Sequence, residues 1–473
     1  MPRAPSRLSR RDFLQGAALA AAGGIAGCDR QDGPTVGDVA ALDRVPVARI
    51  ASPRSEMQLR AVLAGSAGGV SVGGGRYSMG GQIAADHALH IDLRGMNGLV
   101  WLDTGRKRVR VQAGMTWRRL QSLIDPHGLS VKVMQSYSNF TVGGSLGVNC
   151  HGRYVGMGPI VDTVRAFRLV GADGSAVEAT PQSDLFGAAI GGYGGLGVVS
   201  EVELDLADNT RLRRHAERVA LADYPDFHRE RIAAAPDAVL HNADIAPPVF
   251  DAPLAITWSR TDAPLTEPAR LVPEHLDYGG DQTKIWAASE LPIGPSVRDR
   301  YLTQPLLHER VVAWRNHEAS LDARSLEPRT RVLSTFLLQE YFIPVAAFLP
   351  FADVLRRTLA AYGVNALNVS IRHSPGDRRT LLAWAPQEAF SFVLYHKQRN
   401  TPAADAAAGR WTRRLIDAAL DCGGCHYLPY RLHATPAQFR RAYPGVDAFA
   451  RIKARIDPDR RFRNRLWDKY LPR

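Results

Sequence analysis

The chain of 473 residues has little cysteine, and several motifs that would define a function class are missing. Four cysteines are too few for a disulfide scaffold of this length. Cys422 and Cys425 have neither a second pair nor a ligand histidine, so we expect no metal site and interpret them as structural or as a disulfide. No aromatic RNA-binding signature is present, which argues against a nucleic-acid partner. No glycine loop ends in Gly-Lys-Ser/Thr, so no P-loop is expected.

The remaining composition is that of an ordinary globular protein. Apolar residues make up 45% and charged residues 22%, and the length allows a large buried core. Lys and Arg number 59 against 47 Asp and Glu, which gives a net charge of +12. A basic soluble surface explains this excess. An anionic substrate, an anionic cofactor or an acidic membrane surface would explain it equally.

The first 28 residues are predicted to direct export rather than to form part of the fold. Four arginines precede an apolar run over 16–27, which is too short to span a bilayer comfortably. Ser9 to Leu14 resembles a twin-arginine export signal, and Ile25 to Cys28 resembles a bacterial lipobox. We therefore expect a signal peptide over 1–27 and a periplasmic protein attached to the membrane through a lipidated Cys28. Plain cleavage that leaves a soluble periplasmic protein is the alternative.

Three glycine-rich stretches carry the strongest chemical signal. Residues 73–82 follow a predicted strand, residues 138–152 mix glycine with small hydroxyl side chains, and residues 191–199 run into another strand. Consecutive glycines let backbone N–H groups turn toward a phosphate, because no Cβ blocks the approach. Such stretches are costly in entropy unless a ligand or another backbone comes close. Each stretch alone is equally compatible with a simple turn.

In this order and spacing, the three stretches resemble the FAD-binding domain of the vanillyl-alcohol oxidase, or PCMH-type, flavoproteins. In the second half, residues 338–344, 423–444 and 456–462 are similar to sugar-alcohol, aldonolactone and decaprenylphosphoryl-ribose oxidases. The resemblance implies an α+β fold with two main domains and FAD as the cofactor.

The resemblance also implies the domain boundaries. Residues 28–44 would be a polar tether, and 45–206 a PCMH-type FAD-binding domain of two subdomains. Residues 207–445 would be an α/β substrate (cap) domain with an antiparallel sheet, and 446–473 a C-terminal segment that returns to the first domain.

The resemblance places the cofactor against the three glycine stretches. The residues predicted to bind it are Gly73, Gly74, Gly75, Arg76, Tyr77, Ser78, Gln82, Ser138, Asn139, Thr141, Gly143, Gly144, Val148, His151, Gly195, Gly197 and Val198. Many relatives attach the flavin covalently to a His in the first stretch, where Arg76 or Tyr77 stands here. Some add a Cys ahead of the second, where Ser138 or Asn139 stands. We therefore expect non-covalent FAD.

Oxidation of a CH–OH group also requires a group that takes the hydroxyl proton. His151 is similar to the His of the family's His-Gly motif near the flavin. Gln339 and Glu340 alternate on a predicted strand, so only one of them can line the site, and the resemblance to sugar-alcohol oxidases favours Glu340. Arg372 ends a later strand and is a candidate for contact with the substrate.

Tyr430 stands where the prenyl-phosphosugar oxidases place a lysine, and the adjacent Arg431 is a candidate substitute for it. Together these features predict an oxidoreductase that acts on a sugar, polyol, aldonolactone or sugar-lipid and passes electrons to oxygen or to membrane quinone. Two alternatives remain open: a flavin-dependent C=C reductase or dehydrogenase of a lipid, and a non-catalytic flavin-loaded binding protein.

Overall fold

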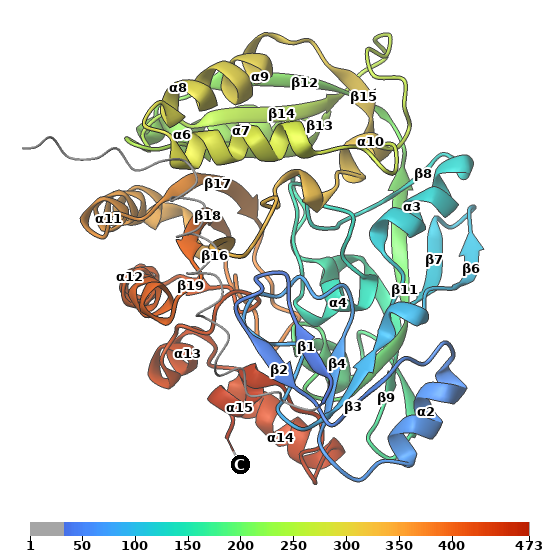
Figure 1. The fold of residues 1–473 in the computed structure, drawn as a ribbon. Helices are drawn as coiled ribbons and strands as arrows, with labels where there is room; N and C mark the ends of the chain where they lie inside the picture. Colours follow the sequence, from blue (N-terminus) through green and yellow to red (C-terminus); the bar gives the residue numbers. More distant parts are fainter. Residues whose placement is uncertain (1–32, 473) are drawn as a thin grey trace, which may run out of the picture.

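The computed structural model describes residues 33–472, and the predicted signal peptide and Cys28 lie outside this range. The described chain forms two domains built around separate sheets (Figure 1). No helix in this part combines the length and apolar character needed to cross a bilayer. Cys150, Cys422 and Cys425 are free thiols here, so the predicted alternative of a Cys422–Cys425 disulfide is wrong.

The first subdomain is a three-stranded parallel sheet with one helix. Its strand order is β3 (Arg49–Ala51), β5 (Leu89–Asp92) and β4 (Val70–Gly73), with α2 (Glu56–Ala64) alongside. Ser55 caps α2 by accepting a hydrogen bond from the Gln58 amide, as its position before an amphipathic run predicts. The buried face of α2 packs with β4 and β5 in one apolar cluster. The C-terminal ends of these strands point toward the glycine stretches.

The second subdomain is built on a larger antiparallel sheet. The strands in order are β10 (Ala176–Ala179), β9 (Val164–Val170), β11 (Val198–Asp208), β7 (Arg108–Gln112) and β6 (Leu99–Asp103), and β8 (Leu129–Val131) pairs with the end of β11. Three helices belong to this subdomain: α3 (Trp117–Ile124), α4 (Val142–Gly147) and α5 (Asp184–Ala189).

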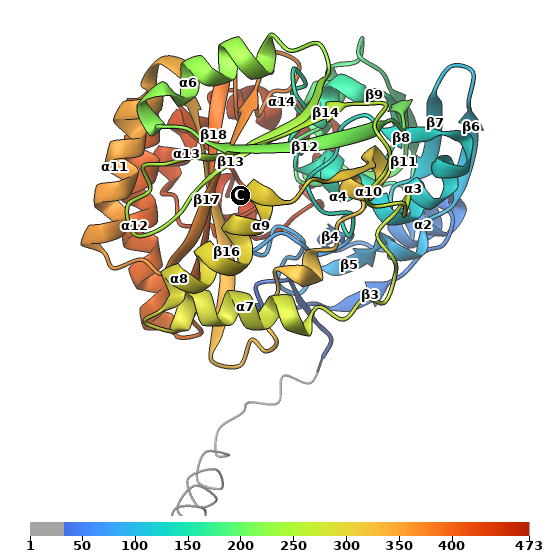
Figure 2. The same ribbon diagram turned by 90° about the horizontal axis from the view of Figure 1, so that it is seen from above.

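The cap domain is an eight-stranded antiparallel sheet. From one edge to the other it contains β15 (Val312–Trp314), β12 (Arg211–Arg218), β14 (Leu254–Arg260), β13 (Ala238–Ile245), β17 (Ala366–Ser374), β18 (Ala389–Arg399), β16 (Ser334–Pro344) and β19 (Cys425–His426). Helices α11 (Phe348–Ala361) and α12 (Pro402–Asp421) lie side by side on the outer face (Figures 1 and 2). The buried residues of α11 recur every three or four positions, so one stripe faces the sheet.

Helix α7 (Gly279–Glu290) packs on the other face of the cap sheet. Its Ile285 contacts Phe336 of β16 and Leu367 of β17 in a small apolar cluster. Phe336, Leu338 and Glu340 alternate onto this same face of β16. Helix α7 therefore lies on the side of the sheet that faces the first domain.

The N-terminal segment departs from its predicted role as a tether. Strands β1 (Thr35–Gly37) and β2 (Arg44–Pro46) pair antiparallel, and their valines pack on Ile83 in a small core. The polar composition of this stretch conceals the apolar positions that make it part of the folded body. The tether prediction is therefore wrong from Thr35 onward.

The C-terminal segment returns to the first domain through α14 (Val446–Ile456) and α15 (Arg465–Tyr470). Phe462 forms a parallel bridge with Val70. The buried Lys453 ammonium donates to the Gly195 carbonyl at 2.6 Å, to the Asp457 carboxylate at 2.7 Å and to the Phe462 carbonyl at 2.9 Å. One cation thus joins the third glycine stretch to the end of the chain.

We expect Lys453→Met to destabilise the protein by about 3 kcal/mol, because it leaves the buried Asp457 carboxylate without its cationic partner. The measurement is urea unfolding followed by circular dichroism. Arg451→Met is the matched control: Arg451 is exposed on the same helix, and its replacement should change the free energy of unfolding by less than about 0.5 kcal/mol. Equal effects of both variants would show that the Lys453 contacts contribute nothing.

Candidate active site

A cavity with two neighbouring lobes lies where the glycine stretches meet the cap sheet. The deep lobe, of about 750 Å³, is lined by the first domain, and the cap lobe, of about 1180 Å³, also reaches β16 and β17; both figures include space open to solvent. The lobes share six lining residues: Gly74, Ser78, Ile83, Thr141, Gly144 and Val148. All three predicted glycine stretches line this cavity.

Close packing within the protein explains some of the glycines. A Cβ on Gly74 would overlap the Thr141 side chain, and a Cβ on Gly143 would lie 2.7 Å from Ala113 Cβ. Gly147 differs, because it lines the deep lobe and a Cβ there would meet nothing within 4 Å. The second stretch therefore uses glycine both to bring backbones together and to keep space open.

Most residues predicted to bind the cofactor line one of the lobes. They are Gly74, Gly75, Arg76, Tyr77, Ser78, Gln82, Thr141, Gly143, Gly144, Val148, His151, Gly195 and Gly197.

Four predicted residues do not line either lobe. Gly73 packs on His90, Val198 is buried in β11, and Ser138 donates to the carbonyls of Ser320 and Leu321. The Asn139 side chain donates a hydrogen bond to the Asp322 carboxylate and accepts one from the Ala323 backbone amide. Val199 lines the deep lobe next to Val198. Ser138 and Asn139 fasten the loop beyond α10 (Arg315–Ala319) and line a neighbouring pocket with Gly75, Tyr77 and Thr141. Cofactor binding by these four residues stays a prediction.

His151 and Glu340 form a buried pair in the cap lobe. The His151 Nε2 atom lies 2.6 Å from Glu340 Oε1, and the Tyr430 hydroxyl donates to Glu340 Oε2 at 3.1 Å. The His151 ring packs among the side chains of Trp384 and Phe342, with ring centroids 5.0 and 5.3 Å away. Strand β16 and the second glycine stretch, far apart in sequence, thus place an acid–base pair at one wall.

The surroundings of Glu340 favour its ionised form. Burial alone would raise the pKa of this carboxyl group, but the contact with His151, the charge of Arg372 and the hydrogen bond from Tyr430 together lower it. Burial and the neighbouring Glu340 hold the pKa of Tyr430 well above its ordinary value, so Tyr430 remains a hydrogen-bond donor.

Arg372 lines the cap lobe, as predicted for a substrate contact, and its buried Nε has no hydrogen-bond partner among residues 33–472. Gln339 does not line the cavity. Alternation along β16 turns it to the face that carries α11, where Tyr341 packs on Phe351. The prediction of Gln339 as a catalytic residue is therefore corrected in favour of Glu340.

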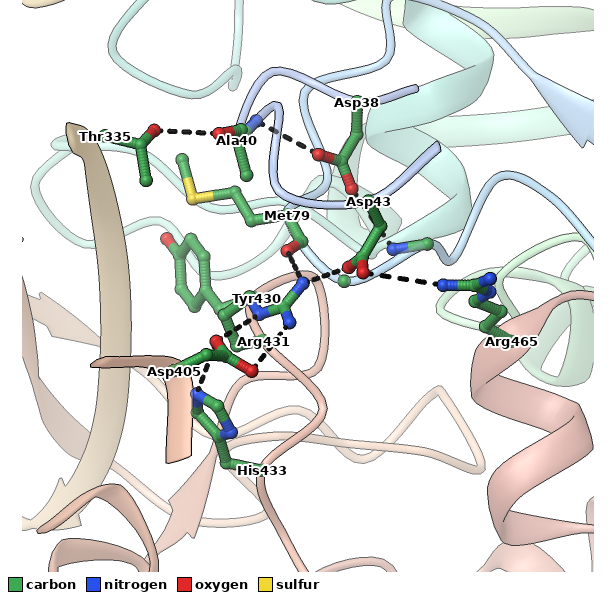
Figure 3. Close-up of polar contacts among 12 residues, drawn as sticks. Asp38, Ala40, Asp43, Met79, Thr335, Asp405, Tyr430, Arg431, His433 and Arg465 are labelled. Carbon is green, nitrogen blue, oxygen red and sulfur yellow. Dashed lines mark hydrogen bonds and ion pairs between the residues drawn. The ribbon is translucent and has the colours of Figure 1, made fainter. Parts of the chain in front are cut away.

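Arg431 turns away from the cavity and does not replace a lysine beside the substrate. Its guanidinium pairs with Asp43 of the N-terminal segment and with Asp405 of α12, and it also donates to the Met79 carbonyl (Figure 3). Asp43 lies 3.6 Å from Arg465 as well. This network fixes the loop that carries Tyr430 and links it to both ends of the described chain.

Several residues that line the cap lobe are not among the predicted site residues. They include Gln135, Tyr137, Arg331, Tyr395 and Tyr427. Tyr427 donates to the Val148 carbonyl, which brings a C-terminal loop onto the second glycine stretch. Tyr427 lies within residues 423–444, the segment that carries the family resemblance, but the resemblance assigns no contact to Tyr427 itself.

Comparison with known proteins identifies the cofactor. A family model described as an FAD binding domain matches residues 47–180. The chain contains an FAD-binding domain. Decaprenylphosphoryl-β-D-ribose oxidase of Mycolicibacterium smegmatis is 25% identical over 422 residues, which cover 85% of this chain and 88% of that protein. Alditol oxidase of a Streptomyces species is 33% identical over 165 residues, 34% of this chain and 40% of the relative.

A solved structure is similar over nearly the whole chain. It is a solvent-stable cholesterol oxidase with a TM-score of 0.70 and 16% sequence identity, covering 92% of this chain and 97% of that one. The fold is therefore that of the PCMH-type flavoproteins, as the three glycine stretches predicted.

The cavity fits FAD on two further observations. Gly147 leaves open space in the deep lobe where any side chain would intrude. Arg76 lines the cap lobe, pairs with Asp92 at 3.1 Å through Nη2, and keeps a buried Nε without a partner in the described part of the chain. A backbone-rich wall and a free guanidinium donor suit an extended ligand that contains a pyrophosphate.

We expect Gly147→Leu to weaken FAD binding by about tenfold or more, because the new side chain enters the deep lobe while leucine suits the helix better than glycine. The measurement is the dissociation constant of FAD for the apoprotein, from quenching of flavin fluorescence. Gly68→Leu is the matched control, since Gly68 also has nothing within 4 Å but lies outside both lobes. Equal affinities of the two variants would place FAD elsewhere.

Proposed function

We propose that this protein is an FAD-dependent oxidoreductase that oxidises a CH–OH group of a sugar, polyol, aldonolactone or sugar-lipid. The buried His151–Glu340 pair carries the proposal, because it supplies a proton acceptor inside the cavity that fits the flavin. The names of the relatives, an oxidase of decaprenylphosphoryl-ribose and an oxidase of alditols, support the same type of reaction.

FAD, when bound, supplies the acceptor for the hydride that leaves the carbon. The chain supplies the acceptor for the hydroxyl proton: Glu340 is ionised in this site, so its carboxylate can take the proton, and His151 lies against it at 2.6 Å. Tyr430 keeps Glu340 oriented, and Arg372 offers donors to a hydroxyl oxygen in the cap lobe. The aromatic side chains around His151 exclude water from the pair.

The location and the electron acceptor belong to the same proposal. Export by the twin-arginine route and attachment through a lipidated Cys28 would place the enzyme on the periplasmic side of a membrane, where quinone or oxygen takes the electrons. The twin-arginine and lipobox resemblances of residues 9–28 support this.

We expect Glu340→Gln to slow substrate-dependent flavin bleaching by about a hundredfold or more, because it removes a basic group that takes the proton. The measurement is anaerobic stopped-flow reduction of the holoenzyme, screened first over polyols and aldonolactones. FAD content should stay unchanged. A Glu340→Gln rate within a factor of about two of the unmodified protein would remove the pair from the mechanism.

We expect Tyr430→Phe to shift the acid side of the pH–rate profile toward neutral pH. The hydrogen bond from Tyr430 lowers the pKa of Glu340, so its loss raises that pKa. Activity requires the carboxylate and is lost as the pH falls through this value, and the raised value brings the loss to a higher pH. A profile that only drops in height, without moving, would assign Tyr430 a packing role.

We expect the flavin to be released into the supernatant on acid precipitation, because Arg76 and Tyr77 stand where relatives carry the linking histidine. Visible absorption spectra before and after precipitation measure this. Flavin that stays with the pellet would show a covalent bond and overturn the prediction of non-covalent FAD.

A further inference from the structure

Five exposed apolar side chains lie outside the site, on two segments that are linked through β18. We call Trp286, Leu291, Ile293, Val332 and Leu333 the apolar ridge. They are 51%, 37%, 61%, 78% and 72% exposed. The first three lie on α7 or in the turn after it, and the last two precede β16.

Polar contacts hold the two halves of the ridge together. Glu290, at the end of α7, lies 2.5 Å from Lys397 and 3.8 Å from Arg399 of β18. The next residue, Asn400, donates its backbone amide to the Leu333 carbonyl at 3.1 Å. The turn after α7 and the segment before β16 therefore belong to one surface.

The ridge adjoins the cap lobe of the cavity. Ala323, Leu326, Glu327 and Arg331, in the chain just ahead of Val332, all line that lobe. Leu326 also packs with Ile285 of α7 in the apolar cluster beneath the helix. A surface that covers the ridge therefore lies beside the residues that border the substrate cavity.

The N-terminal segment packs against the start of β16. The Thr335 hydroxyl donates to the Ala40 carbonyl at 2.8 Å, two residues beyond Leu333 (Figure 3). Helix α7, the start of β16 and the beginning of the described chain share one side of the molecule in Figure 2. Six residues lie between Cys28 and Thr35, so covalent geometry limits the separation of Cys28 and Thr35 to about 25 Å.

The charges beside the ridge suit an anionic partner. Arg329 and Arg399 are exposed there, and the whole chain carries a net charge of +12. Apolar side chains that stand out beside exposed arginines are the pattern of a protein surface that inserts into the interface of an anionic bilayer.

We propose that the apolar ridge docks on the surface of an anionic lipid bilayer, with the cap lobe held beside the membrane. The orientation rests on the proposed attachment at Cys28, whereas the lipid affinity of the ridge does not. In this pose an amphiphilic substrate reaches the cavity while its apolar chain stays in the lipid.

The test uses full-length FAD-loaded protein with Cys28→Ser, so that no acyl chain contributes. Binding to vesicles of phosphatidylcholine and phosphatidylglycerol is measured by co-sedimentation. We expect Trp286→Ser with Leu333→Ser to reduce the partition coefficient by about tenfold or more. Met57→Ser with Val177→Ser is the matched control, because both residues are exposed and apolar but lie in the first domain, on α2 and β10. Flavin content verifies that each variant is folded.

Several outcomes would overturn the proposal. These are no binding by the Cys28→Ser protein, equal loss in the ridge and control variants, and complete release at high salt, which would leave the apolar side chains without a role. A concentration-dependent dimer that the ridge substitutions abolish, with no vesicle binding, would assign the ridge to a second copy of the chain. Flavin bleaching by a soluble polyol is measured separately, so failure of the lipid test leaves the proposed oxidation standing.

Discussion

Close approach of glycine backbone to neighbouring residues around the cavity is the constraint on which the rest of the structure depends. Gly74 lies against Thr141, Gly143 against Ala113, and Gly195 against the Trp467 ring, each too near for an additional Cβ. Segments from both subdomains and from the C-terminus meet in this way. The same glycines leave main chain open in part of the wall of the deep lobe, so glycine at these positions both allows close packing and shapes the flavin site.

The cap sheet adds chemistry to this scaffold through strand alternation. Phe336, Leu338 and Glu340, at alternate positions of β16, line the cavity, and Glu340 contacts His151. The neighbouring positions face α11 and form the core of the cap. A buried carboxylate costs desolvation, and here His151, Tyr430 and Arg372 together offset that cost for Glu340. The groups that keep the carboxylate charged are thus the same groups that line the substrate space.

Much of the architecture could be predicted from local pattern. The residue pattern over 366–371 is typical of a strand, and β17 occupies Ala366–Ser374. The pattern over 350–361 is typical of a helix, and α11 begins two residues earlier. The glycine stretches predicted the cofactor. The direction in which a side chain points could not be predicted where it depends on a partner that is distant in the sequence. Asn139 bonds Asp322, and Arg431 bonds Asp43, which is 388 positions away. The strand that begins at Thr35 could not be predicted from its own residues, because the core that it joins includes Ile83 and Ala84, which are distant in the sequence.

The return of the C-terminus has a consequence for the order of biosynthesis. Phe462 lies beside Val70, and Lys453 donates to the Gly195 carbonyl, so part of the first domain is held by residues that are translated long after it. The ribosome must pass Phe462 before the first domain has all of these contacts. A chain that stops before Lys453 would contain both main sheets, but Gly195 in the deep lobe would lack the cation that holds its carbonyl.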